Sequence, residues 1–558
     1  MSARLPASWI LVFGLLVSAC AAPPRAEQEA PRPNILIIVA DDLGFSDLGS
    51  YGGEISTPNL DALADRGVRF MDFHTAPTCS PTRAMLFTGV DNHLAGVGAM
   101  ADLLSENQRG QMGYEGELTE RVASIAERVG DLGYRTFYSG KWHLGQSPGS
   151  DPSRRGFEES FILVGGGASH FSDRRGIFAW ADPAEYRRNG VPVDQLPEDF
   201  YSSVSYADEL IAYIDGGDDL DRPFLGVLAL TAPHWPLQVL DEDLALYNSA
   251  YDEGYDVWRE RRLANAAKLG VVPEGVTPAP RIAEVVAWES LSPGERAESA
   301  RRMEIFAAMV DRMDREIGRV LAHLEAIGER ENTIILFMSD NGPEGNNRRR
   351  LAASPGWTPD SLDLRIENFG KRNSYVDMGA GWGQVSAAPF SWFKSYPSEG
   401  GTRAPLIIAG PGIAPSGRIV SELTSVMDIA PTVLDAAGGG PGGSQMHGRS
   451  LWPLLQEGVA EGDAEDRVLA WELFGHRAVR RGPWKMVWLT TRTGGGEWKL
   501  FNMDRDPAEQ DDLSAEYPEI VEQLLAEWDT YAETQNIVLP EDLPHRGFSY
   551  DPQTVSGE

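Results

Sequence analysis

The stretch 34-NILIIVADD-42 joins an apolar run to a pair of carboxylates. Residues 35–40 are all apolar and rich in β-branched Ile and Val, which is typical of a strand buried on both faces of a parallel sheet. Asp41 and Asp42 follow at once, and open α/β sheets bind ligands at the carboxyl ends of their strands. The stretch therefore predicts an α/β fold. A solvated turn is the alternative interpretation of the two carboxylates.

Similar strands recur along the chain, and helices separate them. We expect further buried strands at residues 134–138, 223–230, 333–338 and 406–409. Apolar residues at helical spacing predict helices at 57–64, 119–132, 295–327 and 427–437. This alternation is the pattern of a doubly wound domain with a mostly parallel sheet.

Polar side chains follow three of these strands. They are Lys141, His143, His234, Asp340 and Asn341. Lys394 lies in a loop that precedes the strand at 406–409. Because the carboxyl ends of parallel strands meet at one edge of a sheet, we expect these side chains to lie close together. Taken alone, His234 could also be an ordinary structural histidine.

The segment 79-CSPTRAMLFTG-89 has the signals of a helix start. Ser80 can cap the helix, Pro81 suits its first position, and Gly89 is a residue type favoured just past helix ends. Cys79 would then lie at the positive end of the helix dipole, where free N–H groups can hold an anion. Arg83, one turn further on, can reach the same anion. The alternative is a buried cysteine that packs as a small apolar side chain.

The N-terminal residues predict export. Residues 1–20 contain a short apolar run that ends in Val17-Ser18-Ala19-Cys20, which resembles a bacterial lipoprotein cleavage box. Cys20 would then be lipidated, and residues 21–33 would form a Pro- and Glu-rich tether. Cleavage near Ala22 without lipidation is the alternative. The chain has two cysteines, so Cys79 has no partner for an intramolecular disulfide in the folded protein.

Length and composition limit the domain organisation and the kinds of partner that the chain can have. A chain of 558 residues is too long for one core, and we expect a large domain at residues 34–460 and a small α+β domain at 465–558. The small domain should contain an antiparallel sheet from short alternating strands and a helix at 517–534. The net charge of −34 argues against nucleic acid as a partner. An anionic substrate therefore needs a concave site lined by clustered Lys and Arg.

The predicted edge of the sheet contains two kinds of site. Asp41, Asp42, Asp340 and Asn341 offer oxygen ligands only, which suits a hard divalent cation, and calcium fits better than magnesium. The cationic and imidazole side chains form a pocket for a tetrahedral anion: Arg83, Lys141, Lys394, His143 and His234.

Six motifs, in this order and at these separations, closely resemble the type I sulfatases, and especially the bacterial arylsulfatases. They are PNILIIVADDLGFSDLGSYGG, CSPTRAMLFTG, GKWHLG, APHWPLQ, MSDNG and EGGTRAP. The NSYV stretch at 373–376 and WELFG at 471–475 add to the match. The resemblance covers residues 33–540 and implies an alkaline phosphatase-like fold, in which helices flank a large mixed, mostly parallel sheet. It also implies hydrolysis of sulfate monoesters, whether aryl, alkyl or sugar sulfates.

The resemblance further implies that Cys79 does not act as a thiol. In this family a maturation enzyme oxidises the cysteine to formylglycine (3-oxoalanine), which hydrates to a geminal diol. One calcium ion per chain would be bound by Asp41, Asp42, Asp340 and Asn341, and it would contact the modified Cys79.

The reaction hypothesised from the resemblance uses both diol hydroxyls. One attacks sulfur, with Asp340 a candidate acceptor of its proton, and the other helps to expel sulfate with the aid of His143. His234 protonates the leaving-group oxygen, which Lys394 also faces. Arg83, Lys141 and Lys394 stabilise the charge on the transferred group.

Two other functions remain open at this point. One is a phosphonate or phosphate ester hydrolase of the same superfamily, which shares the acidic metal site. The other is a surface lipoprotein that binds sulfated glycans without cleaving them. In all three cases we expect the protein in the periplasm or at the cell surface, anchored by lipid to a bacterial membrane.

Overall fold

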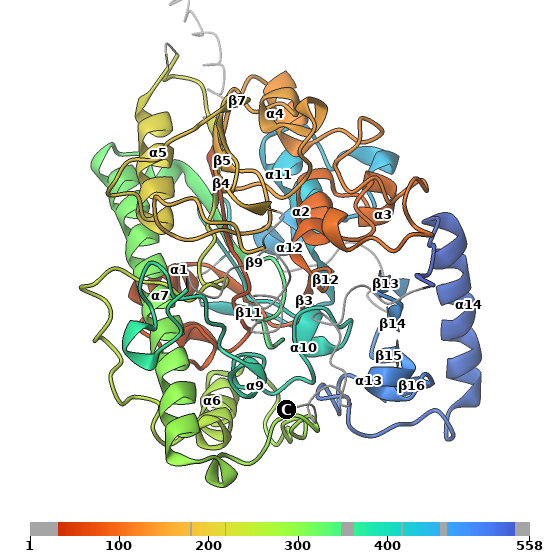
Figure 1. Cartoon of the computed structure of the whole chain (residues 1–558). Helices are drawn as coiled ribbons and strands as arrows, with labels where there is room; N and C mark the ends of the chain where they lie inside the picture. Colours follow the sequence, from red (N-terminus) through yellow and green to blue (C-terminus); the bar gives the residue numbers. More distant parts are fainter. Residues whose placement is uncertain are drawn as a thin grey trace, which may run out of the picture. The chain divides into compact units, whose positions relative to one another are not determined.

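The computed structural model describes residues 32–178, 181–217, 219–346, 362–414, 417–457 and 466–541 (Figure 1). The predicted signal peptide, Cys20 and the tether up to residue 31 lie outside these residues, so their assignment stays a prediction. Within the described ranges, no helix combines the length and the apolar character that crossing a bilayer requires.

A ten-stranded mixed sheet forms the centre of the fold (Figure 1). Its strands in spatial order are β11 (Arg418–Val420), β2 (Val68–Phe70), β10 (Leu406–Ala409), β9 (Thr333–Ser339), β1 (Asn34–Ala40), β8 (Phe224–Ala229), β4 (Arg135–Lys141), β5 (Glu159–Leu163), β6 (Tyr186–Arg188) and β7 (Val191–Pro192). The run from β9 to β5 is parallel throughout, whereas β10, β6 and β7 pair antiparallel with their neighbours. The predicted mixed, mostly parallel sheet is confirmed.

Strand β1 is buried on both faces, as its composition predicts. Leu36, Ile38 and Ala40 pack into the core on one face of the sheet. Ile35, Ile37 and Val39 pack into the core on the other. Since alternate side chains of a strand point to opposite faces, one apolar run contributes to both layers.

Helices cover the two faces of the sheet and complete these cores. The core that contains Leu36 is built with α1 (Pro58–Arg66), α5 (Ser202–Asp215), α6 (Tyr255–Leu269), α7 (Pro293–Ala326) and α9 (Ala380–Ser386). The core that contains Ile35 is built with α2 (Cys79–Thr88), α3 (Asn92–Ala95), α4 (Ile125–Asp131), α11 (Ile429–Ala436) and α12 (Trp452–Glu457). The fold is therefore a helix–sheet–helix sandwich, in agreement with the predicted class.

Several helix starts differ from the prediction, and two of them bear on how the helices are capped. Helix α2 begins at Cys79 with Thr78 as its N-cap residue, so Ser80 is not the cap and Pro81 is not the first helical residue. Helix α4 begins at Ile125 rather than near Thr119, because Ser124 and Glu127 form a reciprocal capping box that fixes the start there. The predicted end of α2 is correct, since Gly89 adopts the left-handed conformation with φ of 68°.

The C-terminal region has the predicted α+β architecture. Its antiparallel sheet contains β13 (Val468–Leu473), β14 (His476–Arg481), β15 (Trp484–Trp488) and β16 (Trp498–Asn502) in sequential order. A short helix, α13 (Thr491–Gly494), lies between the last two strands. Helix α14 (Pro518–Thr534) packs on one face through Leu524 and Trp528.

Buried ion pairs connect this sheet to the segments that lead to the site. Arg480 of β14 donates to both carboxylate oxygens of Asp72, at 2.9 and 2.6 Å. Lys485 of β15 donates to Glu399 at 2.8 Å. Asp72 directly precedes β3 (Phe73–His74), which pairs with β12 (Thr424–Ser425), and Glu399 begins α10 (Glu399–Thr402). Burial alone would raise the pKa of Asp72, but Arg403 and Arg480 hold it well below its usual range.

We expect Arg480→Met to lower the free energy of unfolding by about 3–5 kcal/mol, because it leaves the buried Asp72 charge without one of its partners. Urea denaturation followed by Trp fluorescence measures this change. The matched control is Arg481→Met on the same strand, whose side chain is 30% exposed against 4% for Arg480. Its ion pairs should contribute about 0–1 kcal/mol. Equal losses in the two variants would contradict a special role for the buried pair.

Candidate active site

The carboxyl ends of the central strands converge, as the sequence predicts. Ala40 of β1 lies opposite Ser339 of β9, so Asp41 and Asp340 leave the sheet side by side. Val39 lies opposite Ala229 at the end of β8, which leads to His234. These strand ends carry the carboxylates and the histidine to one edge of the sheet.

Each carboxylate at this edge is paired with a cationic side chain. Lys141 donates to Asp41 at 2.6 Å, and Lys394 donates to both oxygens of Asp42 at 2.7 and 2.9 Å. Arg83 donates to Asp340 through Nε and a terminal nitrogen, at 3.0 and 2.8 Å. All six of these side chains are buried. The structure thus brings the predicted acidic and cationic residues together as three ion pairs, each between one carboxylate and one cationic side chain.

The oxygen atoms of this cluster fit a divalent cation. Asp41 Oδ1 and Asn341 Oδ1 are buried and have no hydrogen-bond partner among the described residues. One ligand atom each from Asp41, Asp42, Cys79 and His234 lies within 4.8 Å of all the others. Buried oxygens without partners are costly unless an ion satisfies them, and carboxylate and amide oxygens suit calcium or magnesium.

The pKa values of the carboxylates also favour a bound cation. Burial raises the pKa of Asp41 to about 7 despite Lys141, and burial also raises that of Asp42 despite Lys394. At Asp340 burial opposes ionisation, but Arg83 and Lys141 outweigh it and lower the pKa. Added positive charge would favour the ionised form of Asp41 and Asp42. A bound cation would therefore stabilise the ionised carboxylates of this cluster.

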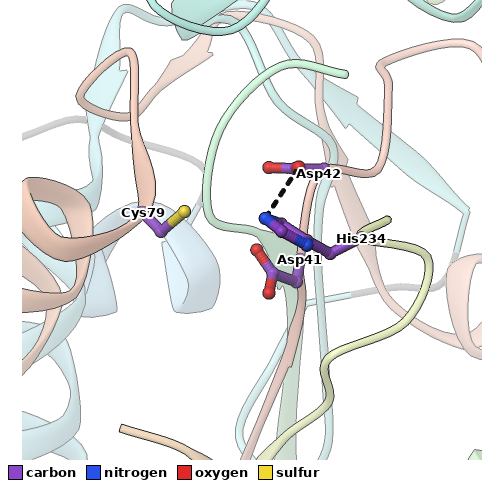
Figure 2. Close-up of side chains that lie close together, drawn as sticks. All are labelled: Asp41, Asp42, Cys79 and His234. Atoms are coloured by element: carbon purple, nitrogen blue, oxygen red, sulfur yellow. Dashed lines mark ion pairs between the residues drawn. The ribbon is translucent and has the colours of Figure 1, made fainter. Parts of the chain in front are cut away.

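Cys79 faces this cluster from the first turn of α2. Figure 2 shows its sulfur pointing toward the space bounded by Asp41, Asp42 and His234. Burial raises the pKa of the Cys79 thiol to about 11 even though Lys141 and Lys394 act in the opposite direction. The unmodified side chain is therefore a neutral thiol at pH 7, and the thiol is a much weaker nucleophile than the thiolate.

Each of the two histidines lies beside a glycine of the same glycine-rich segment. Gly166 is so close to His143 that an added Cβ would lie 2.7 Å from Cε1 of the ring, and one at Gly167 would lie 3.2 Å from Cε1 of His234. The Nδ1 of His143 is buried without a partner among the described residues. Burial lowers the pKa of His143 well below its ordinary value, and Lys141 and Arg83 lower it further. His143 is therefore a neutral imidazole.

His234 has a defined proton arrangement. Its Nδ1 contacts the carbonyl oxygen of Trp235, and since a carbonyl only accepts, this nitrogen carries a hydrogen. Its Nε2 lies 3.6 Å from Asp42 Oδ2, the ion pair drawn as a dashed line in Figure 2. Nε2 is thus the nitrogen that can exchange a proton with a ligand.

A cavity of about 260 Å³ opens onto these groups. Cys79, His143, His234 and Lys394 are among the residues that line it, and we call these four the inner part of the lining. Arg83 and Lys141 are fully buried behind them. An anion seated in the cavity would meet the cationic cluster at its inner end.

Sequence reasoning missed most of the cavity wall. The missed residues are Met100, Asp102, Leu103, Gln146, residues 163–167, Ile177, Phe178, residues 181–185 and Trp235. The run 161-FILVGGG-167 was the available signal, an apolar strand that ends in glycines. Its register, with Leu163 opposite Lys141, brings the glycines beside His143. Tyr138 was also missed: its hydroxyl donates to the Lys141 carbonyl oxygen, which also accepts from Arg83.

Two family models match the chain. The model described as Sulfatase matches residues 33–439. The model described as N-sulphoglucosamine sulphohydrolase, C-terminal, matches residues 389–533.

Curated relatives match over most of their length. An uncharacterised sulfatase of Schizosaccharomyces pombe is 40% identical over 537 residues, which are 93% of this chain and 96% of that protein. An arylsulfatase of Klebsiella aerogenes is 39% identical over 415 residues, which are 74% of this chain and 88% of that protein.

Solved structures have the same fold. Ps i-CgsB in complex with k-i-k-neocarrahexaose has a TM-score of 0.65 and 24% identity, covering 92% of this chain and 95% of that one. A protein solved with its substrate D-glucosamine-2-N,6-O-disulfate has a TM-score of 0.61 and 20% identity, covering 92% and 99%. At these identities the likeness concerns the fold alone.

Proposed function

This chain belongs to the sulfatase family and is a sulfuric ester hydrolase, and we propose that it acts with a formylglycine made from Cys79 and with one calcium ion. The observation that carries the proposal is the position of Cys79. It lies at the start of α2, facing Asp41, Asp42 and His234, with Arg83, Lys141 and Lys394 around it. The substrate is a sulfate ester of an alcohol, phenol or sugar.

The modified residue and the cation would supply what the amino acids lack. Hydrated formylglycine offers two hydroxyl groups, one as nucleophile and one that later expels sulfate, where an ordinary serine has only one. Asp41, Asp42, Asp340 and Asn341 would hold the calcium ion, which supplies positive charge that lowers the pKa of a bound hydroxyl. The buried, partnerless oxygens of Asp41 and Asn341 support this assignment.

Arg83, Lys141 and Lys394 bind and orient the sulfate group. A chain with a net charge of −34 repels anions at long range, so the local positive charge must be concentrated. Lys394 lines the cavity itself, and the other two lie directly behind it. In a buried site such cations stabilise charge that develops on the transferred group more strongly than they would in water.

We assign a different proton transfer to each histidine, donation to His234 and acceptance to His143. His234 holds a hydrogen on Nδ1 through the Trp235 carbonyl, which leaves Nε2, 3.6 Å from Asp42 Oδ2, as the ring nitrogen that exchanges a proton. We assign this proton to the leaving-group oxygen. The ring of His143 is neutral and its Nδ1 has no hydrogen-bond partner among the described residues, so we assign it as an acceptor of a proton. Asp340 is a further candidate acceptor.

We expect His234→Ala to affect poor leaving groups most. Its kcat/KM should fall by roughly 10²–10⁴ for a sulfate ester of a weakly acidic phenol, the usual contribution of general acid catalysis. The loss should be much smaller for 4-nitrophenyl sulfate, whose leaving group needs little protonation. Sulfate release across a series of substituted phenyl sulfates measures the effect. His323→Ala, on α7 and paired with Asp215, is the control that should leave the series unchanged. A uniform loss would contradict the assignment.

The principal test of the reaction class compares two ester types. Aryl sulfates and aryl phosphonate monoesters with the same phenol are given to protein matured in a host with a formylglycine-generating enzyme. We expect preference for the sulfate; a strong preference for the phosphonate would instead support the phosphonate hydrolase. Binding of sulfated glycans without any cleavage by the matured protein would favour the surface lipoprotein.

We also propose, from residues 1–33, that the protein is exported and lipid-anchored through Cys20 to a bacterial membrane, in the periplasm or at the cell surface. Its partners would then be the maturation enzyme, which acts on Cys79, and the sulfate ester itself.

A further inference from the structure

The rest of the cavity lining, which we call its outer part, differs in character from Cys79, His143, His234 and Lys394. Most of the side chains that line it are apolar, and they include Met100, Leu103, Ile177, Phe178 and Trp235. Ile177 and Trp235 belong to one buried apolar cluster, and Phe178 packs against it. The rings of Phe178 and Trp235 meet edge to face at 6.1 Å between centroids. A leaving group beside His234 would therefore contact an aromatic wall.

The charges in this outer part are negative. Asp102, Asp182 and Glu185 line the cavity together with the apolar side chains. Glu185 is paired with Arg187 at 2.7 Å, whereas Asp182 accepts from the backbone N–H of Gly176 at 2.9 Å. Asp102 and Asp182 are exposed. Neither Asp102 nor Asp182 forms an ion pair within the part of the chain that the structure describes, so their negative charge acts on a molecule that enters the cavity.

Lysine and arginine are scarce among the described residues of the cavity lining. Among the described residues that line the cavity, Lys394 is the single lysine or arginine. Its ammonium group is already shared by Asp42 and, at 3.9 Å, Glu344. One sulfate group is matched by the Lys394, Arg83 and Lys141 cluster, but a second anionic group on the substrate would lie among apolar side chains and carboxylates. Desolvating such a group beside like charge is unfavourable.

From this arrangement we infer that the substrate is a monosulfate ester whose leaving group is apolar and carries no negative charge, and that polysulfated or uronate-containing sugars are rejected by Asp102 and Asp182. This inference rests on the proposed sulfatase function and narrows it. Discrimination of this kind combines an attractive apolar wall with a repulsive rim.

Three phenyl sulfates that differ in one meta substituent test the inference. The substituents are ethyl, carboxymethyl and aminomethyl, which are neutral, anionic and cationic at pH 7. We expect kcat/KM for the ethyl compound to exceed that for the carboxymethyl compound by about tenfold or more, because like charges at short range repel strongly near a protein surface. The aminomethyl compound should not suffer this loss. D-Glucosamine-2-N,6-O-disulfate should be a poorer substrate than any of the three.

In the double variant Asp102→Asn/Asp182→Asn, the ratio of kcat/KM for the ethyl compound to kcat/KM for the carboxymethyl compound should move at least about threefold closer to one. Glu260→Gln/Glu519→Gln, which removes two exposed carboxylates from α6 and α14 outside the cavity lining, should leave the ratio unchanged. The inference would be overturned if the wild-type ratio were near one or if the double variant left the ratio unchanged. Efficient cleavage of the disulfated sugar would overturn it as well.

A binding measurement separates this inference from the proposed function. Calorimetric titration of the same three compounds into Cys79→Ala protein reports affinity without turnover. If matured wild-type protein released no sulfate from any compound, the proposed function would fail. The affinity order ethyl above carboxymethyl would still support the charge preference, and the reverse order would overturn it.

Discussion

Cys79→Ala protein should lose sulfatase activity by at least roughly 10⁴-fold, the scale at which removal of a catalytic nucleophile is felt. The reason lies in the position of the side chain. Cys79 lies at the start of α2, lines the cavity, and shares a 4.8 Å sphere of ligand atoms with Asp41, Asp42 and His234. In the proposed mechanism Arg83 and Lys141 bind the sulfate group and the histidines transfer protons, but none of these side chains offers a hydroxyl to attack sulfur. Release of 4-nitrophenol from its sulfate ester measures the loss.

Ser80→Ala provides the matched control. Ser80 is the next residue of the same buried helical turn, and its Oγ has no hydrogen-bond partner among the described residues. Removing this hydroxyl should leave kcat/KM within about threefold of wild type, since no polar contact is lost. An equal loss in both variants would mean that the turn, rather than the Cys79 side chain, is required.

The chemical state of Cys79 is tested separately. Mass spectrometry of the tryptic peptide Phe70–Arg83 should find an aldehyde in place of the thiol when the maturation enzyme is present, and the intact thiol when it is absent. Activity should follow the aldehyde fraction in proportion. A buried thiol with pKa raised to about 11 is poorly suited to direct attack. Full activity with an intact thiol would refute the formylglycine proposal.

The inner part of the site could be predicted because its residues lie next to strong local signals. The apolar run of β1 identifies a buried parallel strand, and Asp41 and Asp42 are fixed at its end. The same holds for Asp340 after β9 and Lys141 at the end of β4. Once strands are recognised as parallel, their carboxyl ends must share an edge, so the meeting of residues about 300 positions apart follows from topology.

The outer part could not be predicted in the same way. β5 is a short strand whose position depends on its long-range register with β4, in which Leu163 lies opposite Lys141. Asp102 and Met100 reach the cavity through a segment without regular periodicity, where the Thr78 hydroxyl contacts the Met100 sulfur at 3.5 Å. The start of α2 was misplaced for a related reason: Ser and Pro residues favour several neighbouring cap positions, and tertiary packing selects among them.

Asp41→Asn should abolish calcium-dependent stabilisation and lower activity by at least about 100-fold. Asp41 contributes one oxygen that Lys141 engages and one buried oxygen without a partner among the described residues. Replacing a ligand carboxylate by an amide removes a charge from a cation site. In wild-type protein, a cation present at 100 times its dissociation constant should add about 2.7 kcal/mol of stability, and a chelator should remove it. The rise in Tm on adding calcium to chelator-treated protein measures this coupling.

The control for this prediction is Asp47→Asn. Asp47 is equally buried and only six residues further on, but its carboxylate binds Arg262 and, at 2.8 Å, Ser386 instead of the cluster at the strand ends. This variant should have a lower Tm throughout, because an Arg262 partner is weakened, yet it should keep the full rise in Tm on calcium addition. Asp41→Asn should show the opposite pattern, with little or no rise. If calcium stabilised Asp41→Asn as much as wild type, the cation would have to bind elsewhere. If chelation left both Tm and activity of the wild-type protein unchanged, the partnerless oxygens of Asp41 and Asn341 would need another explanation.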